Sequence, residues 1–352
     1  MDPTTAVAPP AESAGAAAAP FNPWRFCVAP MMDWTDRHCR FFHRQLTRHT
    51  RMYTEMVTTG ALRHGDVHRH LRFDRAEHPV ALQIGGSDVP LLAHAAELGA
   101  QYGYDELNLN CGCPSDRVQD GGFGACLMMG PKQVAAGVQA MMRASGLPVT
   151  VKCRIGVDYS EDYVFLRDFV EPIAEIGCTT FIVHARKAWL SGLSPKENRE
   201  IPPLRYDTVY RLKQDFPQLT ICINGGIHTM AECLDHLKQV DGVMLGREVY
   251  ENPYRLAEVD AVLFGDTRPA PTRVEVVDAM YDYIHDELAA GTSLHHITRH
   301  MLGLYRNQPG GKQFRRVLSE HDASREPDWD TIEAALAEVE KAAASAGNRA
   351  AA

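Results

Sequence analysis

Short apolar runs recur along the chain and alternate with longer amphipathic stretches. Eight runs are rich in Val, Ile, Leu, Thr and Phe and end at Gly, Pro, Asn or Asp, which is typical of buried strands. Helical patterns follow most of them. We predict strands at 26–31, 52–56, 80–84, 106–110, 149–153, 180–184, 219–224 and 242–245, and helices at 35–48, 88–101, 131–144, 162–176, 206–216 and 230–238.

This order of elements predicts an α/β fold. Eight strands within residues 21–265 match a (β/α)8 TIM barrel in count and length. A doubly wound open sheet is the alternative, but no G-x-G-x-x-G fingerprint follows the first strand. A small all-helical domain is expected at 271–345, with helices at 274–288, 294–305, 312–318 and 329–344. The Ala- and Pro-rich residues 1–20 are expected to be a disordered leader.

Composition narrows the classes of protein. The formal charge of -9 argues against wholesale nonspecific binding to nucleic acid but leaves local patches open. Nine cysteines without regular spacing indicate reduced thiols, and no Cys/His pattern predicts a zinc site. The chain contains neither a secretory signal nor an apolar run long enough to span a membrane. We therefore expect a cytoplasmic protein without a metal, acting as a monomer.

Polar residues and glycines gather where the predicted strands end. In a barrel these ends face one another and form the active site. Glycines after the last two strands are where barrels commonly hold a phosphate with backbone N–H groups, and Arg247 adds a positive charge there. The candidate residues are Pro30, Met31, Met32, Gln83, Asn110, Cys113, Lys152, Arg154, His184, Asn224, Gly225, Gly226, Gly246 and Arg247.

These residues suit a phosphorylated planar ring, and flavin mononucleotide (FMN) fits well. Gln83 and Lys152 would hydrogen-bond the polar edge of the ring, and the lysine would stabilise negative charge on the reduced ring. His184 would help to hold the ribityl phosphate. The alternative is that Lys152 forms a Schiff base, as in barrel aldolases.

A candidate acid lies in the segment 104–126. Residues 106–110 alternate polar and apolar, so we predict a strand that Gly112 and Pro114 end. Cys113 then lies on the loop that leaves the strand, and the glycines at 121, 122 and 124 let this loop approach a ligand. The alternative is a flexible connection with two ordinary thiols.

The predicted C-terminal domain carries a local excess of positive charge. Residues 291–319 contain Arg299, Arg306, Lys312, Arg315 and Arg316 but no Asp or Glu. On an acidic protein such a stretch indicates a surface that faces RNA, with Lys312 and Arg315 on one helical face. The alternative is an ordinary solvated helix face.

Five motifs together resemble the tRNA-dihydrouridine synthases, and within them the A subfamily. The resemblance runs from Phe26 to about Leu318. Any one motif would be moderate support, whereas the combination is strong. The motifs are Ala29-Pro30-Met31-Met32-Asp33, Leu107-Asn108-Leu109-Asn110-Cys111-Gly112-Cys113-Pro114-Ser115, His184-Ala185-Arg186-Lys187-Ala188-Trp189, Ser194-Pro195-Lys196-Glu197-Asn198-Arg199-Glu200-Ile201-Pro202-Pro203-Leu204 and Asn224-Gly225-Gly226-Ile227.

The resemblance implies an FMN-containing barrel, NADPH as the reductant, and reduction of uridine in the D-loop of tRNA at positions 20 and 20a. Cys113 is the expected general acid because it precedes Pro114-Ser115 as the family's thiol does. Cys111 departs from the family's usual small apolar residue, and we expect it to pack. Lys196 and Arg199 are expected to contact the tRNA backbone.

The chemistry of uracil supports this interpretation. Its C5=C6 bond accepts hydride at C6, and C5 then needs a proton from the opposite face, which a thiol can donate. The base must be extruded into the barrel mouth, where Asn110 is expected to hydrogen-bond its edge. Two alternatives are a flavin barrel acting on a free pyrimidine, and an RNA-binding chaperone with an idle barrel.

Overall fold

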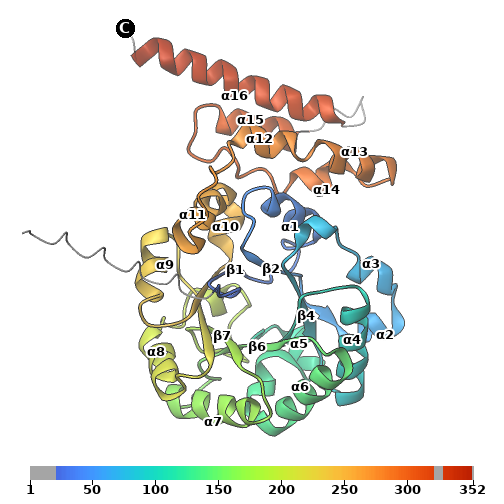
Figure 1. The fold of residues 1–352 in the computed structure, drawn as a ribbon, viewed down its shortest axis with the longest axis vertical. Coiled ribbons are helices and arrows are strands. Elements are labelled where there is room, and N and C mark those ends of the chain that lie inside the picture. Colours follow the sequence, from blue (N-terminus) through green and yellow to red (C-terminus); the bar gives the residue numbers. More distant parts are fainter. Residues whose placement is uncertain (1–20, 321–327, 351–352) are drawn as a thin grey trace, which may run out of the picture.

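The computed structural model describes residues 21–320 and 328–350, so the predicted leader at 1–20 lies outside the described residues. Eight parallel strands form a closed barrel, because β1 pairs with both β2 and β9 and the ring is completed where β2 pairs with β4 (Figure 1). The predicted (β/α)8 barrel is confirmed. Its strands are β1 (Phe26–Val28), β2 (Arg51–Tyr53), β4 (Val80–Gly85), β5 (Glu106–Cys111), β6 (Val149–Arg154), β7 (Thr180–His184), β8 (Thr220–Asn224) and β9 (Gly242–Leu245).

All eight predicted strands are present, but the first two end early. The prediction of 26–31 overran β1, which stops at Val28, because Pro30 has no N–H to donate to a neighbouring strand. The prediction of 52–56 also overran β2. There a two-residue strand, β3 (Val57–Thr58), continues along the edge of β4 and pairs with it alone.

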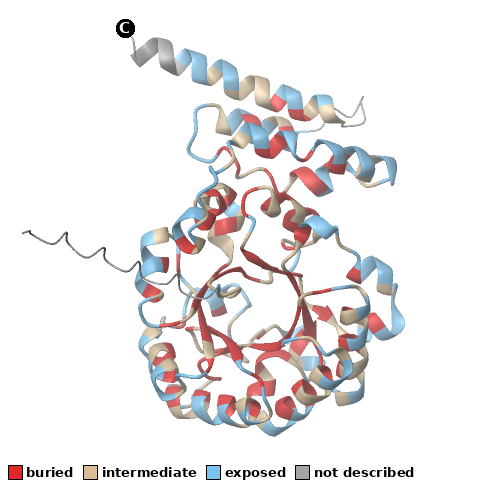
Figure 2. Ribbon diagram, viewed as in Figure 1, coloured by how far each residue is buried: buried red, intermediate tan, exposed pale blue. Residues whose placement is uncertain are grey.

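A layer of helices surrounds the strands (Figures 1 and 2). Asp36 and Asp88 cap the first turns of α1 and α4 by accepting backbone N–H groups, and proline starts α6, as its fixed φ allows. The helices are α1 (Arg37–Arg44), α4 (Val89–Gln101), α6 (Pro131–Ser145), α7 (Asp162–Glu175), α8 (Tyr206–Asp215), α9 (Met230–His236), α10 (Arg247–Glu251) and α11 (Val259–Phe264).

Five short α-helices have no counterpart in the predictions. They are α2 (Thr59–His64), α3 (Val67–Leu71), α5 (Asp116–Asp120), α10 and α11. Each has five or six residues. A segment this short spans less than two helical turns, so hydrophobic periodicity carries little signal there. The third one lies just after Cys113, in the segment that the sequence suggested would be a glycine-rich connection.

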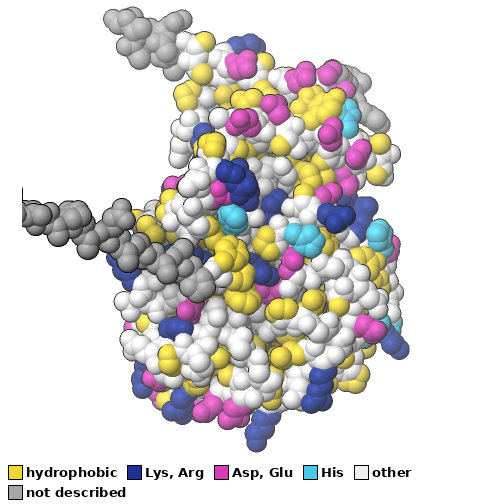
Figure 3. All heavy atoms as spheres, viewed as in Figure 1, with side chains coloured by type: hydrophobic (Ala, Val, Ile, Leu, Met, Phe, Trp, Pro, Cys, Tyr) yellow, Lys and Arg dark blue, Asp and Glu magenta, His cyan; other side chains and the backbone are white. Residues whose placement is uncertain are grey.

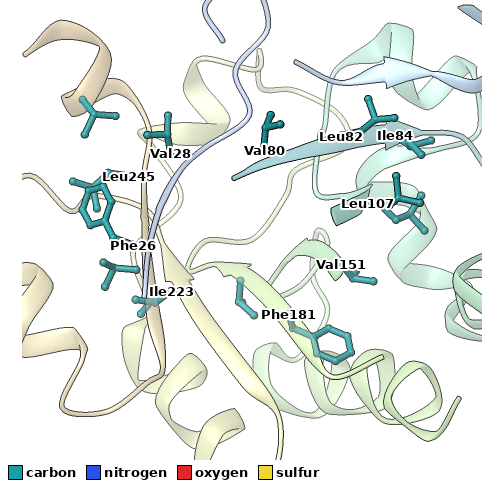
Figure 4. Close-up of a cluster of buried hydrophobic side chains, with 14 of the residues drawn as sticks. Phe26, Val28, Val80, Leu82, Ile84, Leu107, Val151, Phe181, Ile223 and Leu245 are labelled. Atoms are coloured by element: carbon teal, nitrogen blue, oxygen red, sulfur yellow. The ribbon is translucent and has the colours of Figure 1, made fainter. Parts of the chain in front are cut away.

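The strands are buried on both faces. Their outward side chains form the main hydrophobic core against the helices, and Figure 4 shows ten of them labelled, among them Leu107, Val151 and Phe181. Inside the barrel a smaller apolar cluster, which includes Tyr53, Ile182 and Met244, fills part of the space. The rest of the interior is polar and is built on β5.

The polar interior begins with Glu106 on β5, whose side chain is fully buried. One carboxylate oxygen accepts hydrogen bonds from Tyr53 Oη at 2.7 Å and Thr150 Oγ1 at 2.6 Å. The other accepts from Trp24 Nε1 at 2.7 Å and lies 3.1 Å from Arg51 Nη1. A buried carboxylate is tolerated when it is paired and hydrogen-bonded, and here both conditions hold.

The C-terminal region is helical, as predicted, and joins the barrel through α1. Arg37 forms an ion pair with Glu287, and His38 Nδ1 lies 2.8 Å from Tyr283 Oη. The predicted helix 274–288 is broken into two at residues 279–280, and the one at 294–305 stops at 298. The helices are α12 (Arg273–Asp278), α13 (Tyr281–Ala289), α14 (Leu294–Thr298), α15 (Gly311–Ser319) and α16 (Trp329–Ala350).

We predict that Glu106→Gln destabilises the protein by about 3–5 kcal/mol, because it leaves Arg51 without its counter-charge in the interior. The amide of the new glutamine would also place an N–H donor among side chains that all donate to this position. Glu97→Gln, on the exposed face of α4, is the matched control and should change the free energy of unfolding by about 0.5 kcal/mol or less. Denaturant unfolding measures both. Equal stability of the two variants would contradict the role given to Glu106.

Candidate active site at the carboxyl ends of the strands

Three amide side chains continue the polar interior upward from Glu106. Asn108 Nδ2 donates to Thr150 Oγ1 at 2.8 Å, and Gln83 Nε2 donates to Asn108 Oδ1 at 2.8 Å. Asn110 Nδ2 then donates to Gln83 Oε1 at 2.9 Å. Each amide in this chain retains at most one free N–H for a ligand, so Gln83 and Asn110 are held rigidly in orientation.

Asn110 also shapes the start of the loop that carries Cys113. Its Oδ1 accepts the backbone N–H of Gly112 at 3.1 Å and that of Cys113 at 3.0 Å. The chain therefore turns sharply as it leaves β5. The Cys113 side chain is half-buried, and its Sγ lies 3.5 Å from Ser115 Oγ.

The two neighbouring cysteines lie in different environments. The strand ends at Cys111, whose side chain points outward into the hydrophobic core and is fully buried. Burial raises the pKa of this thiol well above 9. Cys111 thus packs against the helix layer, away from the barrel mouth.

Positive charges converge on β6 and β7. Lys152 Nζ donates to Asn224 Oδ1 at 3.1 Å, and burial, followed by the charge of Arg154, lowers the lysine pKa to about 8. Burial and the same two cations lower the pKa of His184 well below 6.5. Within residues 21–320 and 328–350, no carboxylate is among the causes of the pKa shifts of Lys152, Arg154 and His184. Such a cationic centre suits an anionic ligand.

Glycines let the backbone pass very close to this centre. Gly225 and Gly226 follow β8 with φ values of 113° and 68°, which favour glycine. A Cβ on Gly225 would lie 2.5 Å from His184 Cδ2, and one on Gly226 would lie 2.4 Å from Leu204 Cδ1. The backbone after β8 therefore approaches the imidazole more closely than any other residue type would allow.

The remaining residues predicted to bind the cofactor lie around β1 and β9. A Cβ on Gly246 would lie 3.4 Å from Met31 Sδ, so these two residues are close neighbours, and Pro30 is half-buried. Met32, in contrast, is 54% exposed. Arg247 Nη1 lies 2.8 Å from Glu200 Oε1, so its charge is shared with a carboxylate instead of being free for an anion.

Arg154 is a site residue to which the sequence assigned no role. The guanidinium is buried, and its Nε donates to Gly112 O at 2.9 Å. Its Nη1 donates to Lys187 O at 2.8 Å and to Asn198 O at 2.9 Å. The signal was its position two residues after Lys152, which places both side chains on the inner face of β6. Arg154 links the Cys113 loop to the loop after β7.

The loop after β7 carries Lys196 and Arg199, which are both exposed. Lys196 directly precedes the short 3-10 helix η3 (Glu197–Arg199), and Arg199 is the last residue of that helix. Asn198 is fully buried and donates to the carbonyls of Trp189 at 2.9 Å and Leu193 at 3.2 Å. Arg199 lies within electrostatic reach of Cys113 and Arg247. The structure thus places one of the two predicted RNA contacts beside the thiol.

Most of the basic side chains in residues 291–319 pair with a carboxylate. Arg299 binds Asp36 at 2.6 Å, Arg306 binds Glu251 at 3.1 Å, and Arg316 lies 3.9 Å from Glu320. Lys312 and Arg315 are exposed on α15, and neither contacts a carboxylate among the described residues. Acidic side chains dominate the face of the C-terminal helices drawn in Figure 3, so RNA would have to approach from another side.

His49, Asp260 and Asp266 place three potential metal ligands within 4.8 Å of one another. Asp266 is 3.5 Å from Arg48 and 2.5 Å from Arg268, and Asp260 accepts Thr47 Oγ1 at 2.6 Å. These contacts satisfy the carboxylates, which favours a structural role for the cluster. None of the helices in the described part of the chain has the length and apolar character needed to cross a membrane.

Comparison with known proteins gives consistent results. A family model described as "Dihydrouridine synthase (Dus)" matches residues 27–344. The chain is similar to the tRNA-dihydrouridine(20/20a) synthase of Escherichia coli (strain K12), with 58% identity over 89% of this chain and 90% of the relative. The protein of that name in Yersinia pestis is 56% identical over 90% and 91% of the two chains. The one in Vibrio cholerae is 56% identical over 90% and 96%.

Proposed function

The chain belongs to the dihydrouridine synthase family, and we propose that it reduces the C5=C6 bond of uridine in the D-loop of tRNA to 5,6-dihydrouridine. The observation that carries this proposal is the position of the Cys113 thiol, which lies on the loop leaving β5 beside Arg154 and Arg199. A proton donor and a cationic centre thus share one barrel mouth. The names of the relatives support positions 20 and 20a as the targets.

We propose FMN as the bound cofactor and NADPH as its reductant. The residues fit this group: Lys152 and Arg154 provide positive charge beside the imidazole of His184, and the glycines after β8 would let backbone N–H groups come close to a phosphate. Reduced FMN would supply the hydride for uracil C6. Gln83 and Lys152 would bind the polar edge of the ring. Asn224 orients the lysine, since its Oδ1 accepts from Nζ while its Nδ2 donates to Met244 O at 2.8 Å.

Cys113 would donate the proton to uracil C5. Asn110, held by Gln83 and by the two backbone N–H groups it accepts, would bind the uracil edge with its remaining N–H. The uridine must leave the base stack to reach this depth. Lys196 and Arg199 at the mouth, and Lys312 and Arg315 on α15, would neutralise phosphates of the surrounding RNA and hold the tRNA during extrusion.

Single-turnover oxidation of the reduced protein, followed by flavin absorbance, tests the proposal. Unmodified tRNA should oxidise the flavin rapidly, whereas free uridine or orotate should not. Oxidation by the free pyrimidine instead would favour a dehydrogenase of free bases. A protein that binds tRNA but holds no flavin would favour an RNA-binding protein with an idle barrel. The Schiff-base alternative predicts borohydride trapping of a carbonyl substrate on Lys152.

Cys113→Ala should retain bound flavin and NADPH oxidation but lose tRNA reduction by roughly a hundredfold or more, because general acid catalysis typically contributes about that factor. Cys126→Ala, another half-buried thiol, is the matched control and should keep its activity. Dihydrouridine in the tRNA product and the reductive half-reaction are measured separately. Full synthesis by Cys113→Ala would remove the thiol from the mechanism.

FMN affinity should fall as pH rises through about 8, the pKa of Lys152. An anionic ligand binds more tightly when Lys152 is protonated. About one tenth of the lysine remains protonated one pH unit above its pKa, so the FMN affinity falls by tenfold at most by about pH 9. Fluorescence quenching of FMN measures the affinity. In Lys152→Met the affinity should be weaker and independent of pH over the same range. An unchanged pH slope in that variant would assign the titration to another group.

Lys312→Ala combined with Arg315→Ala should weaken tRNA binding and reduce the dependence of log Kd on log salt by about one to two units, as expected for the loss of two phosphate contacts. The pair Lys132→Ala and Arg143→Ala, exposed on α6, removes the same charge on the side of the barrel opposite the C-terminal helices (Figure 1) and should have little effect. Identical salt titrations for both double variants would rule out this surface.

A further inference from the structure

Every backbone N–H and C=O group of Gly112, Cys113 and Pro114 takes part in a hydrogen bond. The N–H groups of Gly112 and Cys113 both donate to Asn110 Oδ1. Gly112 O accepts from Arg154 Nε at 2.9 Å, and Cys113 O accepts from Ala125 N at 2.9 Å. Pro114 has no N–H, and its carbonyl accepts from Gln119 Nε2 at 2.9 Å. The position of the thiol therefore depends on the residues that make these bonds.

Gln119 makes a second bond that leaves its own loop. The same Nε2 donates to Leu190 O at 2.7 Å, so both amide hydrogens are used, one by the Cys113 loop and one by the loop after β7. Gln119 is half-buried and lies on the five-residue helix α5. Among the described residues no backbone–backbone hydrogen bond joins α5 to the loop after β7, so Gln119 and Arg154 connect the two loops through their side chains.

Leu190 is connected rigidly to the proposed RNA contacts. Trp189 exchanges two hydrogen bonds with the buried Asn198, its N–H donating to Oδ1 at 2.8 Å and its carbonyl accepting from Nδ2 at 2.9 Å. Asn198 lies between Lys196 and Arg199 in sequence. Hydrogen bonds therefore connect the segment that carries Lys196 and Arg199, through Asn198, to Trp189 and its neighbour Leu190, where Gln119 is attached.

We propose that Gln119 is a positioning residue that couples the docking of RNA on Lys196 and Arg199 to the placement of the Cys113 thiol over uracil C5. The inference rests on the proposed function. Proton transfer requires the donor within hydrogen-bonding reach of the carbon, and a misplacement of about 1 Å can lower a rate by roughly a hundredfold. A thiol whose position follows the RNA loop would be correctly placed only when the tRNA is docked.

Gln119→Met keeps the length of the side chain and removes both donors. We expect tRNA affinity within about twofold of the wild type and an unchanged rate of flavin reduction by NADPH, but a single-turnover oxidation by saturating tRNA that is roughly 10- to 100-fold slower. Gln119→Glu, which places acceptors opposite two carbonyl oxygens, should be at least as slow. Flavin content and the unfolding midpoint report on folding. A wild-type rate in both variants would overturn the proposal.

A double-mutant cycle separates coupling from a local structural role. Lys196→Ala should slow the saturated reaction in the wild type and slow it less in Gln119→Met, because the link through Gln119 is already absent and only the one through Arg154 remains. Multiplicative effects of the two substitutions would contradict the coupling. Gln101→Met, on the exposed end of α4, is the matched control and should match the wild type. If the wild type is not oxidised by tRNA at all, the proposed function fails. If tRNA oxidises the wild type and both Gln119 variants at the same rate, this inference alone fails.

Discussion

The inner face of β5 is the constraint on which the rest of the site depends. Glu106, Asn108 and Asn110 occupy alternate positions of this strand and point into a barrel whose interior is usually filled by branched apolar side chains. Thr150 joins the first two, because its hydroxyl accepts from Asn108 and must therefore donate to Glu106. The direction of every hydrogen bond from the barrel floor to the Cys113 loop follows from the single carboxylate at the bottom, which accepts from Thr150.

This polar interior also explains how the loop that carries Cys113 is held in one conformation. Asn110 can hold the first two residues of the loop only because Gln83 holds Asn110. Arg154, buried without a carboxylate partner, finds its acceptors in three backbone carbonyls from two loops. A buried guanidinium needs such acceptors, so the loops and the arginine stabilise one another. Arg154 thus joins the Cys113 loop to the loop after β7, which we propose to contact RNA, by hydrogen bonds to both.

The interface between the barrel and the C-terminal helices is also polar. Asp36 caps α1 and at the same time binds Arg299 and His300 of the C-terminal region. Burial opposes ionisation of this carboxyl, but the hydrogen bond and charge of His300 hold its pKa well below the usual range. Directional bonds of this kind fix an orientation more narrowly than apolar contact alone. The barrel mouth and the surface of α15 are thereby held in a defined relation, which a large RNA substrate needs.

The sequence by itself determined the barrel, the helical C-terminal region and the family, because strand and helix periodicity are local properties and the motifs are contiguous. It also placed Cys113, Lys152 and His184 at strand ends, since that follows from where a run stops. Only the tertiary structure decided what each side chain contacts. Alternation in Glu106–Asn110 predicted a strand but not the partners of its polar side chains, which are enclosed by seven other strands. The sequence placed Arg299 in a stretch predicted to face RNA, but the structure pairs it with Asp36, which lies 263 residues away in the chain. Arg154 and Gln119 act on carbonyl groups of distant loops, and backbone acceptors leave no signature in a sequence because every residue has one.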